Sequence, residues 1–271
     1  MYKLEKYKQN LAIQGNKVWS YTTNVATIEG SKLRMILLID ADSLVFASCC
    51  RSKKTIDDVP FYTNLEDCIV KFDEQFMGIV NDLQEIYNVE KVITFNGCKG
   101  NFRKLLTKNY KANRKKQTLP PLLHQMHQYV KDNYASKFGF GIETDDMVAR
   151  YWKTLSDQFG RDEVMIVSID KDYKQFPCLI YNYHHKHKKI IDITPQQALY
   201  NFYEQMIVGD TADNVNYFKG KGKVFAKNYF NNCTTKYQYT KKLYELFKKQ
   251  YKSKAKLKYI QCYNLLKLLT K

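Results

Sequence analysis

The stretch M-I-L-L-I-D at residues 35–40 decides the fold class. A short, continuous apolar run that stops at an acidic residue is typical of a strand buried on both faces, as in a parallel sheet. Two further runs have the same form: residues 92–95 stop at Asn96, and residues 164–169 stop at Asp170. The sequence therefore predicts three buried strands whose carboxyl ends carry polar side chains.

Helical patterns separate these strands. Apolar residues recur at helical spacing from Leu65 to Ile86, and Leu122 to Phe138 is predicted as a second helix, broken by Gly-Phe-Gly at 139–141. After Pro195 the chain is predicted to contain only helices and turns. Strands that alternate with helices favour right-handed crossovers, and so an α/β fold with a mostly parallel central sheet flanked by helices.

We predict three parts along the chain. Residues 35–194 form the α/β core, interrupted by a basic segment at about 97–120, and residues 195–271 form a helical, lysine-rich region. Residues 1–34 form an N-terminal extension in which a β-prone run at 18–25 and a turn signal at 29–31 suggest a small hairpin.

The charge is positive and unevenly distributed. The 271 residues include 44 Lys+Arg and 27 Asp+Glu, a net charge of +17. Residues 91–131 contain no acidic residue, and residues 214–271 contain 15 Lys and one acidic residue, Glu245. A solvated lysine surface that reflects coding bias would explain the preference for Lys over Arg. It would not explain why these two segments contain almost no acidic residues. Such segments attract polyanions, so nucleic acid is the expected partner.

Other classes of protein are excluded by composition. No apolar run approaches the ~20 residues of a membrane span, and the N-terminus lacks the apolar region of a secretory signal. The seven cysteines form no C-x-x-C pair, which disfavours a disulfide framework or a zinc site. We expect a soluble, cytoplasmic monomer (in the host cytoplasm if viral) with no membrane partner.

Acidic residues gather where the predicted strands end and in two later clusters. They are Asp40, Glu143, Asp145, Asp146, Asp170, Asp172, Asp210 and Asp213. Ligands bind at the carboxyl ends of strands in open α/β sheets, and carboxylate oxygens suit Mg²⁺ or Mn²⁺. Two such ions can clamp the attacking water and the leaving oxygen of a phosphodiester. Taken singly, each cluster also fits a helix N-terminus, a turn or a cap.

The order of the motifs resembles one known family. The chain reads I-D-A-D-S-L, F-R, N-Y-K-A-N-R, E-T-D-D-M-V-A, S-I-D-K-D-Y-K-Q, G-D-T-A-D-N-V and G-K-G-K. From about Met35 to Phe230 this resembles the flap endonuclease/5′→3′ exonuclease family, most of all its bacteriophage members, including the phage ribonuclease H branch. The resemblance implies a PIN-like nuclease core, a helical arch over the basic segment and a helix–hairpin–helix motif in the C-terminal region.

The resemblance also implies roles for the acidic residues. The first metal site would comprise Asp40, Glu143 and Asp145. The second would comprise Asp145, Asp170, Asp172 and Asp213, with Asp146 and Asp210 nearby as direct or water-mediated ligands. Both sites would hold Mg²⁺, and Mn²⁺ would substitute for it.

The resemblance gives basic and aromatic residues a role on DNA. Lys111 and Arg114 match the catalytic pair of the arch helix, which contacts the scissile phosphate; the alternative is plain phosphate binding. Arg103 of F-R is expected to bind DNA, and Phe46 to stack on a base or lie in the core. Gly220, Lys221, Gly222 and Lys223 match the hairpin turn that holds duplex phosphate.

One position departs from the family pattern. Relatives carry aspartate where this chain has Asn96, at the end of the second predicted strand. An amide oxygen can coordinate a cation but carries no charge, so Asn96 is at best a weak metal ligand. We therefore expect the first site to need more Mg²⁺ or to prefer Mn²⁺.

The predicted function is that of a metal-dependent, structure-specific 5′ nuclease. Its substrate would be DNA with a free 5′ end or a 5′ flap, or an RNA–DNA hybrid in ribonuclease H-like primer removal. Two alternatives stay open at this point: a PIN-type ribonuclease, and a structure-selective DNA-binding protein catalytically impaired at Asn96.

Overall fold

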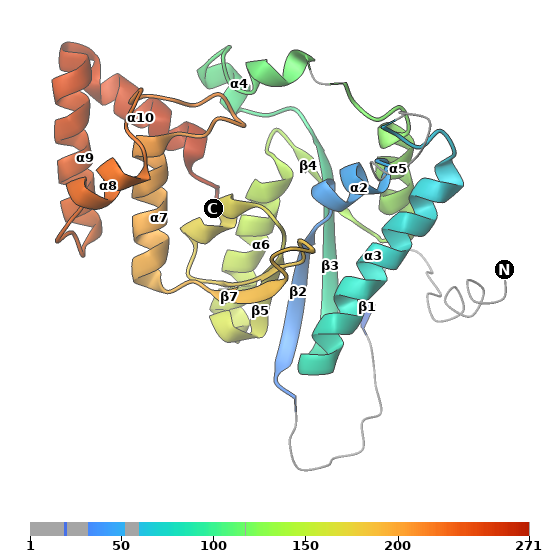
Figure 1. Ribbon diagram of the computed structural model, residues 1–271. Coiled ribbons are helices and arrows are strands. Elements are labelled where there is room, and N and C mark those ends of the chain that lie inside the picture. Colours follow the sequence, from blue (N-terminus) through green and yellow to red (C-terminus); the bar gives the residue numbers. More distant parts are fainter. Residues whose placement is uncertain (1–18, 21–31, 52–59, 117, 271) are drawn as a thin grey trace.

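The computed structural model describes residues 19–20, 32–51, 60–116 and 118–270. Its centre is a seven-stranded sheet in the order β1-β3-β2-β5-β6-β7, with β4 also paired to β3 (Figure 1). The strands are β1 (Trp19–Ser20), β2 (Arg34–Asp40), β3 (Asn88–Lys99), β4 (Lys137–Phe140), β5 (Val164–Val167), β6 (Leu179–Asn182) and β7 (Lys189–Asp192). Only β1 and β7 run antiparallel to their neighbours. The prediction of an α/β fold with a mostly parallel sheet is confirmed.

Helices cover both faces of the sheet. Side chains of a strand alternate between its faces, so Leu37 and Ile39 pack beneath α2, α3 and α5, whereas Ile36 and Leu38 pack with Trp152 of α6. These helices are α2 (Asp42–Ser48), α3 (Leu65–Ile86), α5 (Leu123–Asn133) and α6 (Thr144–Phe159). The continuous apolar run of β2 thus serves two cores, one on each face.

A third apolar cluster joins the C-terminal helices. They are α7 (Pro195–Val208), α8 (Lys223–Tyr229), α9 (Lys236–Tyr251) and α10 (Ala255–Leu266). Aromatic residues dominate this cluster, including Tyr203, Phe218 and Phe247. The division of the chain near residue 194 and the helix–hairpin–helix motif between α7 and α8 stay predictions.

Two predicted boundaries differ from the structure. The helix expected to reach Phe138 ends at Asn133, and residues 137–140 form β4. The apolar spacing changes there from helical to alternating, with Gly139 buried between exposed Phe138 and Phe140. The third predicted strand ends at Val167 instead of Ile169, where the Ser168 hydroxyl accepts a hydrogen bond from the amide of Asp170 at 3.0 Å.

The basic segment contains less helix than the resemblance implies. Within its described residues, 97–116 and 118–120, it has a four-residue helix, α4 (Arg103–Leu106), and one 3-10 helix at Ala112–Lys116. Lys111 has a left-handed backbone with φ 55° and lies outside both. The segment is fastened to the loop after α7, where the Lys111 amide donates to the carbonyl of Asp213 at 2.9 Å.

Most of the N-terminal extension, including the predicted hairpin, lies outside the described residues. Its described strand, Trp19–Ser20, pairs antiparallel with Lys91 and Val92 of β3. Among the helices of the described chain, none has the length and hydropathy needed to cross a membrane.

Candidate active site

A cavity of about 940 Å³ opens where β2, β3 and β5 end. Carboxylates from four segments line it: Asp40, Asp42, Glu143, Asp145 and Asp170. The basic segment contributes Lys104, Lys108, Lys111 and Arg114. We call this the acid cavity. Its position at the carboxyl ends of parallel strands is the usual ligand site of such sheets.

Asp40 is the last residue of β2 and is nearly buried, with 6% of its surface exposed. Its carboxylate accepts a hydrogen bond from the Tyr173 hydroxyl at 2.8 Å. Burial, then the charges of Asp42 and Asp170, raises the pKa of Asp40 to about 7. A nearby divalent cation would favour its ionised form.

Glu143 and Asp145 stand at the start of α6 but have different surroundings. Carboxylate oxygens of Glu143, Asp145 and Asp146 lie within 4.8 Å of one another. Burial opposes the ionisation of Glu143, yet Lys111 and the Tyr110 hydroxyl hold its pKa below the usual value. Within the described residues no cation is bonded to Asp145, and burial, then the charge of Glu143, raises its pKa.

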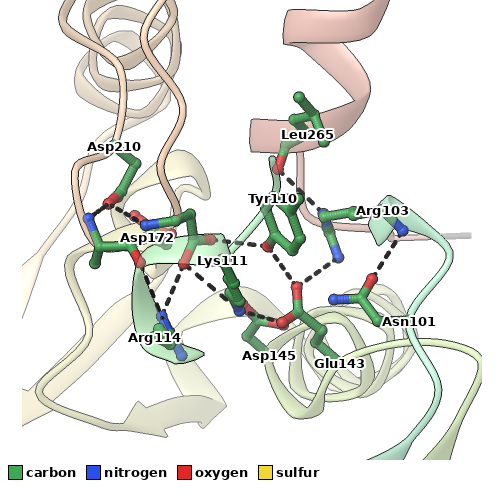
Figure 2. Close-up of polar contacts among 12 residues, drawn as sticks. Asn101, Arg103, Tyr110, Lys111, Arg114, Glu143, Asp145, Asp172, Asp210 and Leu265 are labelled. Carbon is green, nitrogen blue, oxygen red and sulfur yellow. Dashed lines mark hydrogen bonds and ion pairs between the residues drawn. The ribbon is translucent and has the colours of Figure 1, made fainter. Parts of the chain in front are cut away.

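Asp146 faces the protein interior. Its carboxylate binds the Arg103 guanidinium at 2.5 and 2.7 Å and accepts the amide of Leu269 at 2.9 Å. Arg103 also donates to the carbonyl of Leu265, as Figure 2 shows. Asp146 and Arg103 therefore dock the C-terminal end of the chain against α6.

The predicted DNA contact of Arg103 needs correction. Arg103 is 1% exposed, and its guanidinium is bonded to two carboxylates and two carbonyls inside the protein. A group buried and paired in this way has no surface to offer DNA, so we exclude Arg103 from the proposed DNA contacts.

A second group of carboxylates surrounds Asp172. Its carboxylate accepts a hydrogen bond from Gln205 at 2.8 Å, and burial, then the charges of Asp170 and Asp210, raises its pKa to about 7. Asp210 is buried and forms an ion pair with Lys171 at 2.9 Å. Although burial opposes its ionisation, Lys171 keeps the pKa of Asp210 low. Asp210 thus has a cation of its own.

Lys111 and Arg114 connect Glu143, at the start of α6, with Asp213, in the loop after α7 (Figure 2). The Lys111 ammonium is ion-paired with Glu143 and lies 3.6 Å from Asp213, and Arg114 binds Asp213 at 2.8 Å. The structure thus brings Lys111 and Arg114 together with the predicted carboxylates, although Lys111 belongs to no helix.

Asn96 is buried and turned toward His127. Its amide donates to the His127 carbonyl at 2.9 Å, and its oxygen lies 2.6 Å from the His127 ring nitrogen Nδ1. It is not among the residues that line the acid cavity. Both ends of the Asn96 side chain are therefore occupied, which argues against even the weak metal role that the resemblance implies.

We expect Asn96→Asp to destabilise the protein by about 1–3 kcal/mol, because a carboxylate would face the His127 carbonyl without a donor. Divalent-ion affinity should not rise. Thermal unfolding and calorimetric metal titration check both expectations, with Asn81→Asp on the exposed side of α3 as the control. Tighter metal binding by the Asn96 variant would restore its role as a ligand.

Sequence reasoning missed several residues of the site. Asp42 lines the acid cavity and accepts the Gly97 amide at 2.7 Å. The Tyr110 hydroxyl lies 2.7 Å from Glu143 and 2.8 Å from Asp213, so it bridges these two carboxylates. Tyr173 binds Asp40. All three stand within two residues of a predicted site residue, the only signal that could have found them.

Phe46 and the Gly220–Lys223 segment are two further predicted contacts with DNA. Phe46 is half-buried on α2, and neither it nor the Gly220–Lys223 segment is among the described residues that line the cavity. Gly220 has φ 80°, and Gly222 precedes α8 directly. Their roles on DNA stay predictions.

The donor set fits divalent cations with a preference for oxygen. The acid cavity offers carboxylates, and burial, then the charge of neighbouring carboxylates, raises the pKa of Asp40 and Asp145. Mg²⁺ and Mn²⁺ are bound by such oxygens. Of the residues predicted for the first site, Glu143 and Asp145 have carboxylate oxygens within 4.8 Å of each other, and Asp40 lines the same cavity. The two metal positions stay predictions.

Affinity for Mg²⁺ or Mn²⁺ should rise with pH through about 7. Below that pH, Asp40 and Asp172 are protonated in the metal-free protein, and an incoming ion must displace their protons; above it, they are already ionised. Calorimetric titrations in buffers of different ionisation enthalpy would measure this proton release. An affinity that stays constant between about pH 6 and 8 would contradict the expectation.

The comparisons with known proteins agree with this geometry. The family model described as the 5′-3′ exonuclease, N-terminal resolvase-like domain matches residues 35–203. No curated protein matches. A pseudo-enzyme–product complex of the bacteriophage T5 flap endonuclease with DNA and metal ions has a TM-score of 0.60 and 18% identity, over 88% of this chain and 90% of that chain.

A second solved structure, the bacteriophage T5 5′-exonuclease with bound zinc, has a TM-score of 0.59 and 18% identity, over 86% of each chain. At this identity the likeness establishes the fold alone. The family model, however, spans more than half of the chain and contains every carboxylate that lines the acid cavity. The chain therefore belongs to the 5′-3′ exonuclease family, as the order of its motifs predicted.

Proposed function

We propose that the protein is a divalent-metal-dependent, structure-specific 5′ nuclease that hydrolyses DNA with a free 5′ end or a 5′ flap. One observation carries the proposal: in a chain of the 5′-3′ exonuclease family, five carboxylates and the cations Lys111 and Arg114 share one cavity. The T5 relative was solved with DNA and metal ions, which supports the same classes of ligand here.

The division of charge suits phosphodiester hydrolysis. The carboxylates would hold two divalent ions, which when bound would lower the pKa of the attacking water and offset charge on the leaving oxygen. Lys111 and Arg114 approach the same cavity from the basic segment and stabilise charge that develops on the phosphate. Tyr110 holds Glu143 and Asp213 in position through its hydroxyl. No side chain is required as nucleophile.

The rest of the basic surface binds the substrate. Lys104 and Lys108 are exposed at the acid cavity and neutralise phosphates of the strand that enters it. Lys219 and Lys223 are exposed around the Gly220–Lys223 segment, which contacts the duplex. Binding to both would place a junction of single and double strand near the carboxylates.

The test is cleavage of an end-labelled 5′-flap DNA across a titration of Mg²⁺ and Mn²⁺. Matched single-stranded DNA, single-stranded RNA and an RNA–DNA hybrid serve as comparison substrates. We expect short 5′ products from the flap DNA that require a divalent ion and disappear on chelation. Cleavage of the hybrid would add primer removal to the proposed activity.

Two outcomes would replace the proposal. Preferred cleavage of single-stranded RNA would indicate a PIN-type ribonuclease. Tight binding of flap DNA with no product at any metal concentration would indicate a structure-selective DNA-binding protein.

A further inference from the structure

Two exposed phenylalanines stand side by side on β4. Phe138 and Phe140 are 36% and 75% exposed, and their ring centroids lie 5.2 Å apart. Gly139 between them faces inward, where an added Cβ would lie 2.7 Å from the carbonyl of Ile142. The alternation of the strand therefore places both rings on the same, outward side.

The pair stands on the strand next to one that lines the acid cavity, although neither ring is among the described residues that line it. β4 pairs with the end of β3, where Cys98 is opposite Gly139 and Lys99 is opposite Phe140. Cys98 and the nearby Gly100 both line the acid cavity. Figure 1 shows β4 against β3, on the side of the sheet where the basic segment begins.

Glycine makes room for one of the rings. Gly97 has φ 75°, and an added Cβ there would lie 3.1 Å from the ring of Phe138. The Phe138 ring therefore rests close over the backbone of β3, and a larger residue at position 97 would push it away. This contact fixes Phe138 and leaves Phe140 as the more exposed member of the pair.

The charge around the pair identifies its partner. Lys99 is exposed and lies opposite Phe140 on the same face, whereas Lys137 is exposed on the other face of β4. Residues 91–131 contain no acidic side chain. Positive charge interleaved with exposed aromatic faces suits a single-stranded nucleic acid, whose phosphates meet the lysines while its bases stack on the rings. A duplex fits less well, because its base faces are covered by neighbouring bases. An apolar peptide also fits less well, because it offers no negative charge to the lysines.

We infer that Phe138 and Phe140 form a stacking platform for unpaired nucleobases of the strand that enters the acid cavity. The inference rests on the proposed function, because it takes a nucleic acid as substrate. Every base has a π face, so the platform accepts any sequence, and each stacked base contributes about 5- to 150-fold in affinity.

A tryptophan in place of Phe140 provides a direct test. We expect the fluorescence of Phe140→Trp to be quenched by oligothymidylate, in EDTA to prevent cleavage, but not by an abasic strand of equal length. The wild type corrects for the two native tryptophans. Leu33→Trp is the control, because Leu33 is 72% exposed just before β2, at the opposite end of that strand from Asp40.

Affinity gives the second readout. Phe140→Ala should weaken binding of oligothymidylate by about tenfold and leave binding of the abasic strand unchanged, whereas Phe140→Tyr should restore it. Phe140→Leu, which keeps an apolar side chain, should behave like alanine. Equal quenching by the abasic strand, or equal affinity of Phe140→Ala and wild type, would overturn the platform.

Wild-type cleavage of flap DNA, measured in parallel, separates the two proposals. Cleavage without quenching would remove the stacking platform and leave the nuclease. Quenching without cleavage would leave a platform that serves a binding protein.

Discussion

Asp170→Asn should reduce cleavage of 5′-flap DNA by about a hundredfold or more, while DNA affinity stays within about threefold of the wild type. Changes to residues around metal ligands already cost up to about a hundredfold, and Asp170 lines the acid cavity itself. DNA affinity depends on cations that neutralise phosphates, so the loss of a carboxylate does not weaken it.

The fold should tolerate this substitution. The Asp170 oxygen Oδ1 accepts the Asp172 amide at 2.9 Å, and an asparagine oxygen can accept the same bond. What changes is the charge: since Asp170 raises the pKa of Asp172, its removal should lower that pKa from about 7. The variant is therefore expected to be folded, to bind DNA and to release fewer protons when it binds metal.

Cleavage under single-turnover conditions and DNA binding with metal chelated would measure the two effects separately. Asp157→Asn is the matched control, because Asp157 is an exposed aspartate paired with Lys153 on α6. Loss of DNA binding by Asp170→Asn in chelator would mean that Asp170 is a structural residue and has no part in catalysis.

The sequence predicted four of the five carboxylates that line the acid cavity, because the sheet topology governs their positions. Asp40 ends β2 and Asp170 follows β5; the two strands run parallel, and such strands present their carboxyl ends at one edge of the sheet. Glu143 and Asp145 begin the helix that packs on the same sheet. For these four residues the local sequence pattern and the sheet topology both predict a position at the same edge of the sheet.

Partners distant in the sequence account for what could not be predicted. Arg103 meets Asp146, 43 positions away, and Asn96 meets His127, 31 positions away. Neither separation matches the short spacings of a helix or a strand from which a contact can be predicted. An exposed arginine and a buried, paired arginine look alike in a sequence, so the F-R motif and the positive charge of its segment led to the prediction that Arg103 binds DNA. The basic segment likewise takes its shape from its bonds to the loop after α7.

Lys111→Ala is expected to lower turnover by about 10²–10³-fold and DNA affinity by less than about threefold. The Lys111 side chain is 17% exposed and ion-paired with Glu143 within the acid cavity. A cation in this position acts on charge that develops during the reaction more than on the resting DNA backbone. Its removal should therefore reduce turnover selectively.

The substitution should also change the pH dependence. Lys111 is the main group that lowers the pKa of Glu143 against burial, so in Lys111→Ala that pKa rises. A carboxyl with a higher pKa loses its charge at a higher pH as the solution is acidified. The acid limb of the cleavage profile should accordingly move to higher pH in Lys111→Ala, and Lys111→Arg should move it back.

Lys108→Ala supplies the contrast needed to interpret this result. Lys108 is exposed at the same cavity, and no carboxylate is bonded to it within the described residues, so its removal should weaken DNA binding and leave turnover near the wild-type value. Equal losses of turnover and affinity in Lys111→Ala, with an unchanged pH profile, would make Lys111 a phosphate anchor like Lys108. A loss confined to turnover would place Lys111 in the chemistry, because only a group that acts more strongly on the transition state than on bound DNA has that signature.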